Sequence, residues 1–178
     1  LPGNNILWDI RKGHVKGYVN DFAVDGFEFK DLTTKVSGRA DASCIGLTTS
    51  LPMSLKYRIS GFNFTPESLS DFIACWAPGT NLALEKTLPN KPFRLDATGS
   101  GTLDRMDVNA SISSRYGNAD ADIDLRNLAS PERGIEIGGT IDTHNLDISA
   151  FTGIEQQDST LIPGTTVHLM GRHAYNYV

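Results

Sequence analysis

The feature that most constrains this chain is a two-residue alternation of apolar and polar side chains, which returns in nearly every segment. Leu55, Tyr57 and Ile59 alternate with lysine, arginine and serine. The apolar residues between positions 119 and 125 alternate with aspartates. Successive strand residues point to opposite faces of a sheet, so each run presents one apolar and one polar face. Clean alternation favours antiparallel strands, because parallel strands are usually buried on both faces. We therefore predict a mainly β chain with a long antiparallel sheet.

One stretch, residues 65–76, replaces the alternation with a helical pattern. Thr65 can cap a helix N-terminus, and Pro66 suits the first helical position. Apolar residues then recur at i, i+3, i+4 and i+7 from Leu69 to Trp76, which makes a single apolar stripe before a Pro-Gly pair. We predict one short amphipathic helix near 65–76, inserted between strands.

Two stretches about 80 residues apart are alike. Residues 57–64 predict a strand with a glycine kink that leads into the helix, and residues 135–142 predict a similar strand that leads into a possible helical turn before residue 153. We interpret the chain as a single fragment of a repeat array. The expected parts are first-repeat strands in 1–64, a helical insert in 65–78, second-repeat strands in 79–153, and a next unit or tail in 154–178.

Composition excludes several classes of function. The chain has 178 residues, 39% of them hydrophobic, and a formal net charge of −5. An acidic chain without a basic run argues against nucleic-acid binding and against docking on anionic lipid headgroups. Its apolar runs are far shorter than the roughly 20 residues of a spanning helix. The opening Leu1-Pro2-Gly3, without an initiator Met or a signal pattern, indicates a processed product or a piece of a longer chain.

Motifs for catalysis, metals or cofactors are not found in the sequence. The aspartate run at 120–124 begins like a calcium loop, but Leu125 and Pro131 stand where that loop needs Gly and Glu. The histidines lack metal-ligand spacing, and residues 97–102 match neither a nucleophile elbow nor a dinucleotide fingerprint. Cys44 and Cys75 permit one disulfide and are interpreted as small buried side chains. We expect a protein that is not an enzyme and takes no metal or cofactor.

The order of these features resembles the TamB/AsmA-like superfamily. The resemblance covers most of residues 20–153 and rests on degenerate strand patterns in a characteristic order: 53–64, the helix at 65–72, 93–104, 109–125 and 139–148. Members are long envelope proteins of Gram-negative bacteria, anchored in the inner membrane and extended through the periplasm. The resemblance implies a β-taco, a long sheet rolled into a groove with a hydrophobic inside. It also implies phospholipid movement between the membranes, and outer-membrane protein assembly with an outer-membrane barrel protein of the TamA type.

On this resemblance we expect a periplasmic segment whose groove binds phospholipid acyl chains. An acyl chain needs a continuous apolar lining, and each buried CH₂ contributes about 0.8 kcal/mol. The predicted lining consists of the apolar positions of three alternating runs: Leu55, Tyr57, Ile59, Ala119, Ala121, Ile123, Leu125, Ile135, Ile137 and Ile141. The aspartates at 120, 122 and 124 are expected to face water on the other side.

Two other classes stay open at this point. A self-contained β-sandwich would bury the apolar face against a second sheet and bind carbohydrate or protein at the cell surface. Composition alone favours this arrangement. A chaperone-like module would instead add a client strand to an exposed sheet edge. A closed interior would favour the sandwich, and an uncovered apolar face would favour the groove.

Overall fold

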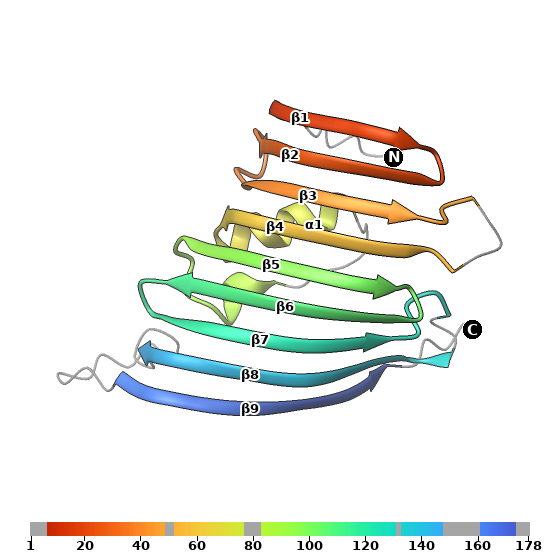
Figure 1. Ribbon diagram of the computed structural model, residues 1–178. Helices are drawn as coiled ribbons and strands as arrows, with labels where there is room; N and C mark the ends of the chain where they lie inside the picture. Colours follow the sequence, from red (N-terminus) through yellow and green to blue (C-terminus); the bar gives the residue numbers. More distant parts are fainter. Residues whose placement is uncertain (1–6, 49–51, 77–82, 131–132, 148–160, 174–178) are drawn as a thin grey trace, which may run out of the picture.

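The computed structural model describes residues 7–48, 52–76, 83–130, 133–147 and 161–173. These residues form one open nine-stranded antiparallel sheet, in which each strand pairs with the next along the chain (Figure 1). The strands are β1 (Trp8–Tyr18), β2 (Asp21–Asp31), β3 (Ser37–Ile45), β4 (Ser54–Phe64), β5 (Phe93–Thr102), β6 (Arg105–Ser114), β7 (Gly117–Arg126), β8 (Ile135–Asp147) and β9 (Leu161–His173). The helix α1 spans Pro66–Trp76, and the 3₁₀ turn η1 spans Leu84–Lys86. The mainly β fold with a long antiparallel sheet and one short helix is confirmed.

The helix α1 begins where the sequence predicts. The Thr65 hydroxyl accepts a hydrogen bond from the Ser68 backbone N–H at 3.2 Å, and the Thr65 N–H donates to the Ser68 hydroxyl at 2.8 Å. This reciprocal cap satisfies backbone donors that the first helical turn leaves unpaired. In Figure 1, α1 lies behind β3–β5, against one face of the sheet.

An aromatic cluster joins α1 to that face. Val36, Phe62, Phe64 and Phe93 are buried together, and Leu69 and Phe72 of α1 pack against them. The rings of Phe62 and Phe72 meet edge to face with centroids 6.2 Å apart, and those of Phe64 and Phe93 stack at 5.8 Å. The buried core therefore sits at one end of β3–β5, where the helix covers the sheet.

Two glycine bulges interrupt the strand pairing in the same way. The register shifts between Val24 and Phe27 in β2, and between Ile59 and Phe62 in β4. The N–H of Gly26 donates to Asp41 of β3 at 2.6 Å, and the N–H of Gly61 donates to Asp96 of β5 at 2.7 Å. Each bulge thus leaves a backbone donor that an aspartate on the next strand accepts.

The two bulges also share an ion pair. In each case an arginine two residues before the aspartate pairs with it: Arg39 with Asp41, and Arg94 with Asp96. The strand pairs β2–β3 and β4–β5 therefore share one arrangement of bulge, aspartate and arginine. The predicted copy of β4 is β8, which pairs with β7 without a register shift and lacks the bulge. The helical turn expected beyond residue 147 lies outside the described residues.

The remaining expectations on the fold have mixed outcomes. Within the described ranges there is one sheet, so the second sheet of a sandwich is not among them. Residues 161–173, which the sequence left as a next unit or tail, form β9 and extend the same sheet. Cys44 is buried and Cys75 is half-buried.

Candidate functional site: the apolar face of the sheet

The predicted lining residues lie on three strands of the sheet and on one of its faces. Leu55, Tyr57 and Ile59 belong to β4, residues 119–125 to β7, and residues 135–141 to β8. β5 and β6 separate β4 from β7, so the lining residues are not all adjacent. The pairing register nevertheless aligns eight of the ten in shared rows, because directly paired residues of neighbouring strands point to the same face. Ala119, which pairs with Ile112 and Thr143, and Ile135, which pairs with His173, lie outside these rows.

Three rows of paired residues cross the sheet from β3 to β9. We name each after its β4 residue. The Leu55 row is Cys44, Leu55, Gly101, Met106, Leu125, Ile137 and Gly171. The Tyr57 row is Ala42, Tyr57, Gly99, Val108, Ile123, Gly139 and Leu169. The Ile59 row is Ala40, Ile59, Ala97, Ala110, Ala121, Ile141 and Val167.

The three rows contain no charged residue, and their side-chain polar groups are the Tyr57 hydroxyl and the weakly polar Cys44 thiol. They cross seven strands, so at about 4.8 Å per strand spacing they extend about 29 Å. Bulky side chains repeatedly face glycine or alanine on the next strand, as Leu55 faces Gly101 and Ile123 faces Gly139. The face therefore offers a long apolar surface in which large side chains are flanked by small ones.

This face is only partly shielded from solvent. Most of the predicted lining residues are half-buried, and Ile137 and Val167 near the β9 edge remain 41% and 45% exposed. The aromatic cluster under α1 lies beyond the Ile59 row, toward the other end of β4. Among the described residues, no second layer of strands packs over the three rows.

Sequence reasoning missed the residues that connect β4 to β7. The rows are completed by Ala97, Gly99 and Gly101 of β5 and by Met106, Val108 and Ala110 of β6. The alternation of Val108, Ala110 and Ile112 was visible in the sequence as a strand signal. The β5 segment carries only small residues at its apolar positions past Leu95, so hydrophobicity alone did not mark it as lining.

Tyr57 carries the one hydroxyl group in the three rows. Its ring lies over Gly99, since a Cβ built on Gly99 would be 2.3 Å from Cε1 of the ring. Burial raises the pKa of the Tyr57 phenol, because the charged phenolate would lose hydration there. The neutral phenol is therefore the form that this face favours.

The opposite face is polar, as the aspartates at 120, 122 and 124 predict. Asp124 pairs with Arg126 at 2.9 Å and with Arg105 at 2.9 Å. The hydrogen bond from Arg126, with the charges of both arginines, lowers the pKa of Asp124. Asp120 lies 3.3 Å from His144 of β8. Ion pairs between exposed side chains are typical of a surface in contact with water. The apolar face is therefore the candidate site.

Other types of site find no support in the described part of the chain. No group of histidine, cysteine, aspartate and glutamate side chains there is placed to hold a metal ion. Of the helices in the described ranges, none has the length and apolar character that a membrane crossing requires. Compared with protein-family models, curated proteins and solved structures, the chain gave no match.

Proposed function

We propose that this chain is a segment of a longer periplasmic protein whose apolar sheet face binds phospholipid acyl chains and conducts them between the inner and outer membranes. The observation that carries the proposal is the set of three rows from β3 to β9, which contain no charged side chain. The resemblance to the TamB/AsmA-like superfamily adds the cellular setting: an inner-membrane anchor and an outer-membrane barrel partner in the full-length protein.

The dimensions of the face suit an acyl chain. One leaflet of a bilayer holds about 15 Å of hydrocarbon, half of a core roughly 30 Å thick. The rows, at about 29 Å, are long enough for two such lengths end to end. Each CH₂ group of the acyl chain that leaves water contributes about 0.8 kcal/mol to the free energy of binding, whichever part of the apolar face it contacts. Binding therefore needs no specific contact.

The same features suit movement along the rows. A hydrogen-bonding side chain in the rows would hold a lipid at one position, since a hydrogen bond in an apolar environment is costly to break. Apart from the buried Cys44 thiol, the rows offer only the Tyr57 hydroxyl. Small residues such as Gly99 and Ala110 keep neighbouring bulky side chains apart. Strands added at the β9 edge would lengthen the rows without changing their chemistry.

Photo-crosslinking tests the proposal. A photoreactive residue is placed at Ile123, on the apolar face, or at its neighbour Asp122, on the polar face, in the full-length protein inside Gram-negative cells. We expect phospholipid adducts at Ile123 and none at Asp122, because adjacent strand residues face opposite sides. Phospholipid captured equally at both positions, or at neither in folded protein, would overturn the proposal.

A further inference from the structure

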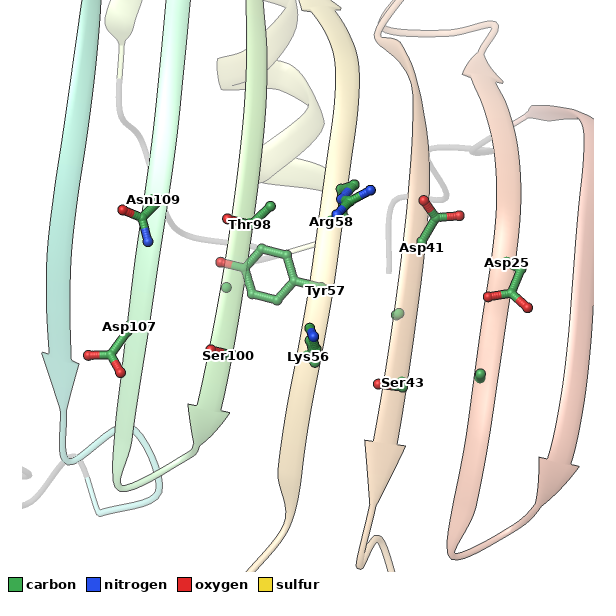
Figure 2. Close-up of a pocket in the computed structure, with 13 residues that line it drawn as sticks. Asp25, Asp41, Ser43, Lys56, Tyr57, Arg58, Thr98, Ser100, Asp107 and Asn109 are labelled. Atoms are coloured by element: carbon green, nitrogen blue, oxygen red, sulfur yellow. The ribbon is translucent and has the colours of Figure 1, made fainter.

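The polar face carries an open hollow of about 400 Å³ over β2–β6. Its lining includes the exposed cations Lys56 and Arg58 and the carboxylates of Asp25, Asp41 and Asp107 (Figure 2). Arg58 of β4 is paired directly with Asp41 of β3 in the strand register. Because charges of both signs lie together, the hollow favours no ligand charge. The two edges of the sheet differ from each other more clearly.

The β1 edge carries features that disfavour a further strand. β1 and β9 are the outer strands of the described sheet (Figure 1). The register of β1 with β2 shifts twice, between Ile10 and Lys12 and between Lys12 and His14. Arg11, Lys12 and Lys16 are exposed along the same strand. Bulges interrupt the backbone ladder, and lysines on an edge strand oppose its pairing with another chain.

The β9 edge lacks these features. β9 runs for 13 residues and pairs with β8 without a shift in register. Its sequence contains no aspartate, glutamate or lysine, and Arg172 already pairs with Glu136 of β8 at 3.8 Å. Val167 is 45% exposed and Met170 is 98% exposed. A long edge strand with little charge and exposed apolar residues is a ready template for pairing with another strand.

Two β9 strands complement each other when they run antiparallel about Leu169. Directly paired residues share a face of the sheet. On the apolar face, Leu169 then lies opposite its own copy, and Val167 lies opposite Gly171 of the second copy. A large residue beside a small one repeats the pattern within the sheet, where Ile123 is paired with Gly139. The edge is therefore self-complementary on its apolar face.

The polar face of the same pair keeps its arginines apart. Arg172 lies opposite the uncharged Thr166 of the second copy. The two Arg172 residues lie three positions on either side of Leu169, and so about 20 Å from each other. A pair of β1 strands about His14 would instead place Lys12 opposite Lys16, and like charges directly opposite are destabilising.

A head-to-tail contact between β9 and β1 of another copy is less favourable. Each strand is antiparallel to the next, so β1 and β9 point in the same direction and would meet as parallel strands. Parallel pairing is slightly less stable per residue, and the register shifts of β1 would interrupt it. The contact that this chain favours is therefore β9 with β9.

We propose that two copies of this chain pair through β9, antiparallel about a twofold axis at Leu169, to form one continuous sheet. The axis is perpendicular to the sheet, so the apolar faces of both copies lie on the same side. The three rows of one copy then meet those of the other, cross fourteen strands and extend about 62 Å at about 4.8 Å per strand spacing. The use of this longer surface by lipid rests on the proposed function, whereas the pairing itself needs no lipid.

Sedimentation equilibrium of the unmodified chain, without lipid, tests the pairing. We expect a reversible equilibrium between monomer and dimer. Met170 is almost fully exposed, so M170K changes the edge without disturbing the packing of the monomer. M170K should raise the dimer dissociation constant at least about tenfold, because it brings two lysines close together across the strand pair. The matched control V15K adds the same charge at an exposed apolar position of β1 and should change the constant by less than about twofold.

Oxidative cross-linking tests the register. In a C44A/C75A background, L169C should form a disulfide-linked dimer, because the Cα atoms of directly opposite residues are about 5 Å apart. T165C is the control and should stay monomeric, since its two copies lie four positions on either side of the axis, about 27 Å apart.

Four results would overturn the proposal. They are a chain that stays monomeric, equal weakening by M170K and V15K, growth into species larger than the dimer, and a dimer that L169C does not link. None of them bears on phospholipid adducts at Ile123, so a failure of the pairing is distinct from a failure of the proposed function.

Discussion

The phenol ring of Tyr57 occupies the space that a side chain at Gly99 would need, with Cε1 only 2.3 Å from the position of a Cβ on Gly99. The two residues are directly paired across β4 and β5, so the ring lies down over the neighbouring strand. We expect Gly99→Ala to lower the free energy of unfolding by about 1–3 kcal/mol, because the ring must shift. Urea denaturation measures this difference.

Gly138→Ala is the matched control for this substitution. A Cβ at Gly138 meets no atom within 4 Å, so its effect should stay within about 0.5 kcal/mol. Replacing Tyr57 by Ala should abolish most of the cost of Gly99→Ala, since the ring is what a methyl would meet. A cost that persists without the ring would show that the Gly99 backbone, and not Tyr57, sets the requirement.

Gly61 tests the bulge in β4. Its φ is +58°, a conformation that L-residues adopt at a cost of about 1–2 kcal/mol. We expect Gly61→Ala to destabilise the fold by about that amount in urea denaturation. Gly171→Ala, in a strand position with open space around it, is the control and should be nearly neutral. Equal stability of the two variants would remove the argument that the bulge requires glycine.

Asp96 gives a pH dependence with a definite sign. The hydrogen bonds from Arg94 and from the Gly61 N–H lower its pKa below the usual 3.8. A lowered pKa in the folded state stabilises the fold above the unfolded pKa, and this stabilisation is lost as the pH falls through the folded value.

Asp96→Asn should therefore be less stable than the unmodified chain at pH 7 and pH 5, and the difference should shrink below about pH 3.8. Urea denaturation at pH 7, 5 and 2.5 measures it, with the exposed Asp122→Asn as control. A difference that stays constant down to pH 2.5 would mean that the charge of Asp96 is not what stabilises the bulge.

Phe72 tests the contribution of the helix. Its ring packs edge to face on Phe62 and against the buried aromatic cluster. We expect Phe72→Ala to cost about 3 kcal/mol in free energy of unfolding. The neighbouring Asp71 is exposed, so Asp71→Ala should change stability by less than about 0.5 kcal/mol. A small effect at Phe72 would mean that α1 is not needed to hold β3–β5.

Ile123→Arg tests the apolar rows directly. The substitution places a charge on the apolar face close to Ile141. Ile123 pairs with Gly139, two residues before Ile141 on β8. With a photoreactive residue at Ile141, we expect Ile123→Arg to reduce phospholipid adducts at least tenfold, because a desolvated charge is costly beside an acyl chain. Asp122→Arg, on the polar face, should leave the adducts unchanged. Equal yields in both variants would mean that lipid does not follow these rows.

The class of fold and the faces of the strands can be predicted from local sequence patterns. Alternation of period two assigns Leu55 and Ile123 to an apolar face without any knowledge of their neighbours, since it depends only on strand geometry. The helix at Pro66–Trp76 was equally predictable, because its cap and its apolar stripe are local features.

The identity of neighbouring strands, and of the residues that share a row, follows only from the folded sheet. Nothing local in Gly99 indicates that it lies between Tyr57 and Val108; that follows from the register of β4, β5 and β6. The same is true of Asp41 and Asp96, which accept hydrogen bonds from the bulges at Gly26 and Gly61 on the neighbouring strands. Contacts between strands join residues distant in the chain, so local periodicity predicts which face a residue occupies, while only the folded sheet determines its partners.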